Sequence, residues 1–501
     1  MQVIGALLAT AFAVATASCV VAVYRRRRPQ DVAFAALAAV CVVIFVLGLV
    51  LAIRPAQARP VAQKLGHVPS AWPTSAAKKR QVMTFADGYR DVLSAHKTER
   101  EVAAWALASA AKSGFQDLFK SQKISPGDKL FASAHGSLVA LVIIGTRPLG
   151  EGAQVIVAGI DTARIDLKPQ PIYADADLAL LQTHYYGHIK PYQWLSIPLE
   201  LRGVVALGSG RVIKVGIGDD PGEPVLVIPD LGPGVSAAVD GREGESIPAE
   251  KLDPIVGSIP GPTKRSGDRF AQAATRAIER GLGIRARDLA AAELSLVPAG
   301  DARDVGIDRG LLAGYGHDDR ACAYAAVRAL LSARRPARTA IVLLVDKVET
   351  GSVGQTSARS AFLRRLYAEL IERTGQSSTE ARVSAALAAS VAAVGDAQAA
   401  AHPAYAAYYA DRGAPVMGAG VILGDGTRAA TGHDVRAALR AGRIPVQAAQ
   451  PSDLAAAVGL LGIPAIRLAV PVLSQSAPTE LMSKADLYAL YRAYALFFAR
   501  R

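Results

Sequence analysis

The stretch 313–356 constrains the fold of this chain more than any other. Two adjacent acids, Asp318 and Asp319, open an alanine-rich run of helical character, and an apolar strand at 339–345 leads into a loop that holds Glu349. Carboxylates at the ends of a helix and a strand are typical of hydrolases that hold two metal ions. Acids in these places also serve as ordinary helix caps and turn residues, so the pattern alone leaves both interpretations open.

The composition is that of a large globular protein. Of the 501 residues, 51% are hydrophobic and 20% are charged, which is enough for a large core and for more than one domain. The formal net charge is +13, but Lys and Arg are dispersed apart from four arginines at 25–28. Nucleic acid is therefore not expected as a partner, because solvated surface or attraction to anionic lipid explains the excess. Cys19, Cys41 and Cys322 provide neither a disulfide framework nor a cysteine metal site.

Two uncharged apolar stretches, 3–24 and 32–53, are each long enough to cross a hydrocarbon core of ~30 Å as a helix. They predict a transmembrane hairpin within residues 1–54, although the first stretch alone could also be a signal peptide. The arginine-rich loop at 25–28 is expected on the cytoplasmic side, with both termini opposite. The sequence thus predicts a two-pass membrane protein, with the membrane as a partner and an extracytoplasmic main domain.

The rest of the chain begins with a linker at 55–80, followed by helical periodicity over 81–121. Two apolar runs rich in β-branched residues, 137–145 and 153–161, are expected to be central strands of a covered sheet.

A change of pattern divides the later part of the chain. Residues 170–290 consist of short alternating segments punctuated by Gly and Pro, whereas strand and helix patterns alternate from 291 onward. The prediction is an α/β domain made of 81–169 and 291–501, interrupted by a β-rich domain at 170–290.

Several separate motifs resemble the aspartyl-aminopeptidase family of zinc metallopeptidases. The most specific is YGHDDRACAYAAVRALL, which is followed by LLVDKVETGS. The resemblance implies a phosphorylase/hydrolase-like metallopeptidase domain, with 170–290 as an inserted dimerisation domain and hence a homo-oligomer. Six further blocks carry it in order along the chain: 159–175, 183–205, 256–261, 293–310, 395–405 and 483–498.

The family's two zinc ions share a bridging Asp, and each ion adds one His and one further carboxylate. The resemblance places the bridging residue at Asp318 and the two further carboxylates at Glu349 and Asp396. All three metal-binding carboxylates of the family are thus present.

The other family positions are changed. The motif in which an Asp orients the first His ligand reads Gly159-Ile160-Asp161, so Asp161 is retained and Gly159 stands in place of the imidazole. Ser476 stands in place of the second His, and Val348 in place of the catalytic base. The sequence therefore retains the carboxylates and lacks both imidazoles and the base.

Two substrate-side features also differ, because a Gly-rich turn is replaced by 450–453 and an expected His aligns with Gly234. His188, His317 and His402 lie within or near family motifs, and we interpret them as surface or hydrogen-bonded residues rather than replacement ligands.

Two functions follow from these residues. The first is a catalytically impaired, membrane-anchored aminopeptidase-like protein that binds a peptide or protein partner or acts as a scaffold, with zinc lost or weakly held. The alternative is an active aminopeptidase whose remodelled carboxylate site uses a harder ion such as Mn²⁺ or Mg²⁺.

Overall fold

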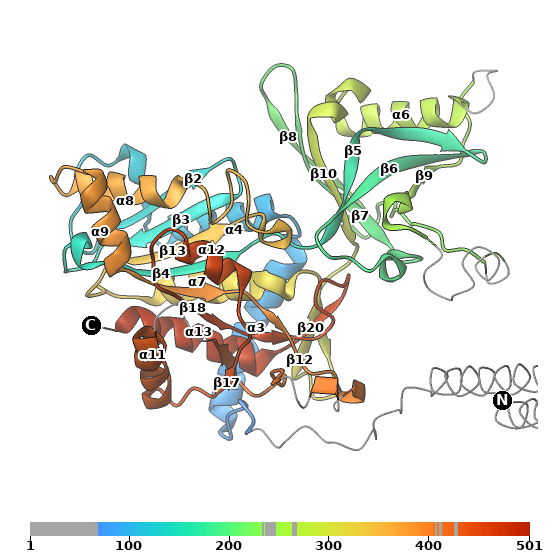
Figure 1. Ribbon diagram of the computed structural model, residues 1–501. Coiled ribbons are helices and arrows are strands. Elements are labelled where there is room, and N and C mark those ends of the chain that lie inside the picture. Colours follow the sequence, from blue (N-terminus) through green and yellow to red (C-terminus); the bar gives the residue numbers. More distant parts are fainter. Residues whose placement is uncertain are drawn as a thin grey trace, which may run out of the picture. The chain divides into compact units, whose positions relative to one another are not determined.

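The computed structural model describes residues 69–232, 235, 247–262, 268–405, 408–409, 413–424 and 429–500. At its centre is a nine-stranded sheet in the order β1-β2-β3-β13-β4-β14-β18-β16-β17 (Figure 1). These strands are β1 (Gln116–Asp117), β2 (Lys129–Ala134), β3 (Leu138–Ile143), β4 (Gln154–Gly159), β13 (Ala340–Val345), β14 (Val391–Gly395), β16 (Val421–Leu423), β17 (Val446–Ala448) and β18 (Ala465–Ala469).

The middle of this sheet is parallel. Strands β13, β4, β14 and β18 are neighbours that run in the same direction, and β3, β13 and β4 are buried along their whole length. Apolar strands of this kind need helices on both faces. The strands expected at 137–145, 153–161 and 339–345 are confirmed as β3, β4 and β13.

Helices cover both faces of the sheet. Val139 and Leu141 of β3 pack in the same core as helices α3, α4, α7, α11 and α13, whereas Leu138 and Ala140 pack with α8, α9 and α12. This alternation is the two-residue period of a strand. The helices are α3 (Ala76–Ala95), α4 (Glu99–Lys112), α7 (His317–Ser332), α8 (Phe362–Arg373), α9 (Glu380–Ala389), α11 (Ala429–Ala441), α12 (Asp453–Gly459) and α13 (Lys484–Ala499).

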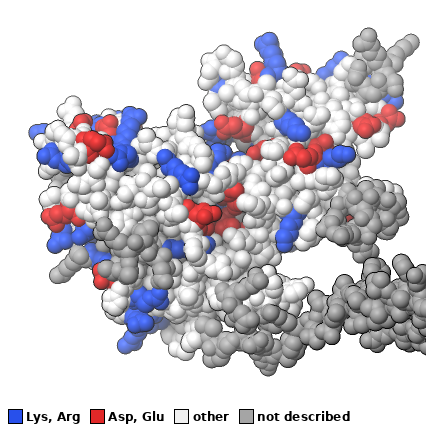
Figure 2. All heavy atoms as spheres, viewed as in Figure 1, with Lys and Arg blue, Asp and Glu red and all other residues white. Residues whose placement is uncertain are grey.

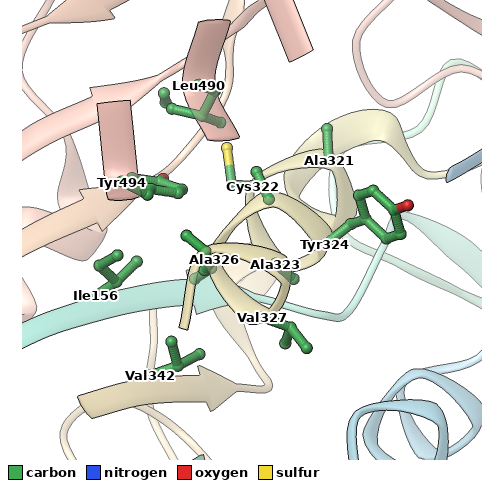
Figure 3. Packing of buried hydrophobic residues seen from close by; sticks show 14 of the residues in the cluster. Ile156, Ala321, Cys322, Ala323, Tyr324, Ala326, Val327, Val342, Leu490 and Tyr494 are labelled. Atoms are coloured by element: carbon green, nitrogen blue, oxygen red, sulfur yellow. The ribbon is translucent and has the colours of Figure 1, made fainter. Parts of the chain in front are cut away.

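Helix α7 is buried on nearly all sides, which explains its high alanine content. Figure 3 shows Ala326 of α7 near Ile156 of β4, and Leu490 and Tyr494 of α13 close to the same helix near Cys322. Small side chains allow a helix to approach both a sheet and a second helix closely. The packing therefore fixes the N-terminus of α7, and with it Asp318, against the sheet.

A second, antiparallel sheet lies between β4 and α7 in the chain. Its order is β8-β7-β10-β5-β6-β9, and α6 (Asp268–Leu282) lies along it (Figure 1). The strands are β5 (Arg164–Asp175), β6 (Leu178–Tyr186), β7 (Leu199–Ala206), β8 (Val212–Ile217), β9 (Ile255–Gly257) and β10 (Ala292–Pro298). It has a separate apolar core around Trp194 and Leu296. The domain boundaries predicted at 170 and 290 remain predictions.

Two small sheets complete the part of the chain that the structure describes. One has the order β11-β12-β20 and the other pairs β15 with β19. Their strands are β11 (Arg303–Val305), β12 (Leu311–Gly314), β15 (Gln398–Ala399), β19 (Pro471–Val472) and β20 (Glu480–Ser483).

The prediction of two membrane-spanning helices is corrected here. Within the described ranges, no helix has both the length and the apolarity that a membrane span requires. Helix α3, for example, has 20 residues but carries charged side chains such as Lys79, Asp87 and Arg90. The predicted spans 3–24 and 32–53 lie outside the described residues. The transmembrane part of the fold prediction and the two-pass membrane localisation are therefore withdrawn, and the described residues have a mixed α/β fold.

Candidate active site

The candidate residues lie at one edge of the central sheet. Asp396 follows the last residue of β14, Asp161 follows β4 after one residue, and Glu349 lies in the short helix η6 (Val348–Thr350) after β13. These three strands are parallel, so their carboxyl ends meet at the same edge. Asp318, in the first turn of α7, reaches this edge because α7 packs across β4.

Three carboxylates form the centre of the site. One carboxylate oxygen each from Asp318, Asp319 and Asp396 lies within 4.8 Å of the other two. Asp318 and Asp319 are 5% and 4% exposed. Burial raises the pKa of Asp318 to about 6, and the neighbouring charge of Asp396 adds to this effect. Burial likewise raises the pKa of Asp319, and the neighbouring charge of Asp318 raises it further.

Gln475 and Glu480 hold Asp318 in place. The side-chain amide of Gln475 donates to Asp318 Oδ2 over 2.7 Å. The backbone N–H of Asp318 donates to Glu480 Oε2 over 2.9 Å, and the N–H of Ser476 donates to Glu480 Oε1 over 2.7 Å. Glu480, which is fully buried, therefore ties the 476 position to the start of α7.

A guanidinium faces Asp396. Arg467 Nη2 lies 3.3 Å from Asp396 Oδ1, and Arg467 Nε donates to the Asp396 carbonyl oxygen over 2.7 Å. The Ser452 hydroxyl also donates to the Asp396 carboxylate. Burial raises the pKa of Asp396, and Arg467 acts in the opposite direction.

Glu349 is half-buried beside this cluster. Burial raises its pKa to about 8, and the charges of Asp318, Asp161 and Asp396 add to the shift. Burial thus raises the pKa values of all four acids, Asp318, Asp319, Glu349 and Asp396.

The space beside Gly159 is already filled. A Cβ atom built on Gly159 would lie 2.5 Å from Asp319 Oδ2 and 2.9 Å from Val348 Cγ2. An imidazole at this position would need Asp319 to move. Asp319 thus occupies the room that a larger side chain at 159 would require.

Asp161, which stands where the family has the Asp that orients an imidazole, contacts other groups in this chain. It accepts a hydrogen bond from the Tyr186 hydroxyl at 2.8 Å and from the backbone N–H groups of Val348 and Glu349 at 3.1 Å each. Asp161 thereby fixes the turn that carries Glu349.

The site opens into a cleft of about 670 Å³. Figure 2 shows acidic side chains gathered near the centre of the visible face, over the region where Figure 1 places α12. The candidate residues that line the cleft are Asp318, Asp319, Val348, Glu349, Asp396 and Ser476, and Gln475, Ser452 and Arg467 line it with them. Their role as metal ligands remains a prediction.

None of His188, His317 and His402 has a described contact with the carboxylates Asp318, Asp319 and Asp396. His317 is fully buried, with Nδ1 3.1 Å from the Tyr89 hydroxyl and Nε2 3.2 Å from the Leu312 carbonyl, and burial lowers its pKa to about 3. His188 is exposed at the cleft wall, and exposed His402 lies beside Tyr405. Gly234 lies outside the described residues.

Sequence reasoning gave no role of their own to three residues of the site. Arg467 is a lone charge in the apolar strand β18, and this pattern could have marked it. Ser452 was included only within the altered turn at 450–453, although it also caps α12 through the Ala455 N–H. Gln475 gave no signal, because its contact with Asp318 depends on a fold that brings distant segments together.

Known proteins match this chain over most of its length. A family described as Aminopeptidase I zinc metalloprotease (M18) matches residues 92–498. The "Probable M18 family aminopeptidase 1" of Borrelia garinii subsp. bavariensis is 35% identical over 447 residues, covering 85% of this chain and 97% of the relative. The crystal structure of the M18 aminopeptidase from Thermotoga maritima has a TM-score of 0.81 at 32% identity, covering 87% of this chain and 100% of that chain. The mApe1 dodecamer of S. cerevisiae shares the fold, with a TM-score of 0.67 at 19% identity over 84% of this chain and 97% of that chain.

Proposed function

Because the chain belongs to the M18 family of aminopeptidase I zinc metalloproteases, we propose that its acidic cleft binds the amino-terminal end of a polypeptide and hydrolyses it poorly or not at all. The family description and the names of the relatives support the ligand class. The weak hydrolysis is inferred from this chain's own residues.

The donor set carries this proposal, since it does not fit a catalytic zinc pair. Catalytic zinc ordinarily has three protein ligands, and His is prominent among them. Here the expected imidazole positions are Gly159 and Ser476, and Asp319 fills the space at 159. Among the described lining residues, His188 is the one imidazole, and it lies on the exposed wall.

The missing base weakens hydrolysis further. Val348 occupies the family's base position, and its side chain cannot accept a proton. General acid–base catalysis contributes typically ~10²–10⁴-fold to a rate. Ligands and base act as one unit, so their separate losses should not be multiplied.

The charge of the cleft supports an amine as the ligand. Asp318, Glu349 and Asp396 line it together with Asp319, against the guanidinium of Arg467. A protonated amino terminus offers three N–H donors and a positive charge to such oxygens, as a lysine ammonium does. The free amino group is thus the part of a polypeptide that this cleft can distinguish.

A second candidate function is an active aminopeptidase with a harder ion. The close approach of oxygens from Asp318, Asp319 and Asp396 favours it, since oxygen-only ligand sets suit Mg²⁺ or Mn²⁺. The names of the relatives also favour an active enzyme. The missing imidazoles and base favour the first candidate.

One experiment separates the two functions. Binding of a fluorescent peptide with a free amino terminus is compared with binding of its N-acetylated form, and release of the first residue is measured with Zn²⁺, Mn²⁺, Mg²⁺ and Co²⁺. We expect binding that acetylation abolishes and no release above the background of the metal alone.

Variants make the test specific. Glu349→Gln should weaken binding of the free amino terminus, whereas Glu250→Gln, an exposed acid of the second sheet region, should not. Robust release by the unmodified chain that Glu349→Gln abolishes and Glu250→Gln spares would establish the second candidate. Equal binding of both peptides would contradict the first.

We also propose that copies of this chain associate into a homo-oligomer. A dodecamer is known for the S. cerevisiae protein that shares this fold, and the second sheet ends in β8, which pairs only with β7 among the described strands. Sedimentation velocity at micromolar concentration should give a mass of at least two chains. A strict monomer would contradict this proposal.

A further inference from the structure

Arg467 supplies a fixed positive charge at the point where the cleft would otherwise need a bound cation. We propose that its guanidinium is the permanent counter-ion of Asp396, so that this side of the cleft keeps its structure without a divalent metal. The inference rests on the proposed function, because it concerns how the same cleft is held together.

The contacts of Arg467 are extensive. Besides the 3.3 Å ion pair with Asp396, its Nη1 donates to the carbonyl oxygens of Gln450 and Pro451 over 3.2 Å each, and its Nη2 donates to the carbonyl oxygen of Ala397. The side chain is only 7% exposed. All three guanidinium nitrogens therefore have acceptors, and the group is held in one orientation.

A metal ion on Asp396 would have to share this carboxylate with Arg467. A guanidinium is effectively always protonated, so the positive charge cannot be removed at any pH at which the protein folds. Two positive charges beside one half-buried carboxylate repel each other, because its surroundings screen them less than water does. Arg467 thus disfavours a cation at Asp396.

The carboxylates of Asp396 and Asp318 also accept hydrogen bonds from neutral side chains. Ser452 donates to Asp396, and Gln475 donates to Asp318. Each donor occupies one oxygen atom of its carboxylate, Oδ2 in both cases. They satisfy the acids with partners that belong to the chain.

Arg467 has a structural role in addition to its charge. It joins the segment after β14, at Asp396 and Ala397, to the turn at Gln450 and Pro451 before α12. Both segments line the cleft. The guanidinium therefore holds two walls of the cleft together, as a structural metal can do elsewhere.

The first measurement uses the unmodified full chain. Its thermal midpoint is recorded in chelator and in titrations with Zn²⁺, Mn²⁺ and Mg²⁺, and metal content is measured by atomic emission after dialysis. We expect no stoichiometric metal and no fall of the midpoint in chelator. One or more retained equivalents of metal, with a lower midpoint after chelation, would overturn the inference.

Variants then test Arg467 directly. Arg467→Met removes the charge but keeps much of the volume, so its midpoint should fall and should rise again in part when Mn²⁺ or Mg²⁺ is added. Arg467→Lys keeps the charge and loses the fork of donors, so its midpoint should fall without a response to metal. Arg492→Met, which removes an exposed arginine bonded to the Gly442 carbonyl, should do neither.

If Arg467→Met does not fold, the unmodified chain and Arg467→Lys still decide the question, because neither should be stabilised by Mn²⁺ or Mg²⁺. A rise of the midpoint with metal in the unmodified chain or in Arg467→Lys would refute the role of Arg467. The outcomes are also separable from the proposed function. A chain that binds metal but does not hydrolyse peptides contradicts only the inference, and one that hydrolyses peptides without bound metal contradicts only the proposed function.

Discussion

Substitution of Lys97 by methionine should destabilise the protein strongly. Lys97 lies between α3 and α4, is 4% exposed, and forms a 3.0 Å ion pair with Glu200 of the second sheet. Its Nζ also donates to the carbonyl oxygens of Pro298 at 2.9 Å and Gly300 at 2.8 Å. The ammonium thus has three acceptors, all from the second sheet or the segment that leaves it.

The magnitude follows from these contacts. Removal of one partner of a buried ion pair typically costs ~3–5 kcal/mol, because the other charge is left uncompensated. Here Glu200 keeps a second cation, since Arg202 Nε lies 2.8 Å from the same oxygen. The two carbonyl oxygens lose a charged donor, whereas methionine avoids the cost of burying an ammonium. We therefore expect the lower end of the range, a loss of ~3 kcal/mol of unfolding free energy.

Urea denaturation followed by Trp194 fluorescence measures this loss. Trp194 is fully buried in the core of the second sheet, and replacement of Trp72 and Trp105 by phenylalanine makes its signal unique.

The matched control is Arg100→Met. Arg100 lies three residues away and pairs with Glu293 at 2.5 Å, but these side chains are 30% and 60% exposed. Exposed pairs contribute only ~0–1 kcal/mol. Equal destabilisation by Lys97→Met and Arg100→Met would refute the argument that burial sets the cost.

Three further substitutions test the structure. Gly203 has φ 143° and a Cβ there would overlap the Glu293 carbonyl oxygen, so Gly203→Ala should cost at least ~2 kcal/mol in urea denaturation, whereas Gly208→Ala, with open space around it, should cost little. Burial raises the pKa of Asp486 from 3.8 to about 7. Its protonated form is favoured in the fold, so the stability it contributes is present below pH 3.8 and is lost as the pH rises through about 7. In the matched variant Asp486→Asn, the loss of unfolding free energy between pH 3.8 and about 7 should disappear. A pH profile of stability that the substitution leaves unchanged would contradict the raised pKa of Asp486. Asp161→Asn should speed hydrogen exchange of the Val348 and Glu349 amides about tenfold or more, since a bond to a charged acceptor contributes ~1.5–3 kcal/mol. The Lys347 amide, bonded to Asp346 Oδ1, is the internal control, and its exchange rate should not change. If the substitution changed the exchange rates of all three amides by the same factor, this role of Asp161 would be excluded.

The central part of the fold could be predicted because its strands are buried on both faces. Apolar runs such as 137–145 leave little choice of structure, and each proved to be a strand of the central sheet. Asp318, Glu349 and Asp396 were grouped by the resemblance to the aminopeptidase family, and all three line the same cleft, although their role as ligands stays a prediction.

Other features depended on contacts between distant segments. The ion pair of Lys97 with Glu200 joins residues far apart in the chain, and no local pattern at either residue indicates it. The apolarity of 3–24 and 32–53 suggested membrane spans, but hydropathy alone does not establish how such a stretch folds, and no described helix supports that interpretation.

The departures from the family pattern at the cleft are connected, because Asp319, Asp161 and Asp396 each lie beside other groups of the chain. Without an imidazole at Gly159, the Asp319 carboxylate lies in the space beside it. Asp161 bonds the turn at Val348 and Glu349 instead of a histidine ring, while Asp396 has the guanidinium of Arg467. Asp161 and Asp396 thus have partners within the chain, from a backbone turn and a guanidinium respectively. A single reversion such as Gly159→His would therefore meet Asp319 and leave Arg467 in place, and we expect it to restore neither metal binding nor hydrolysis.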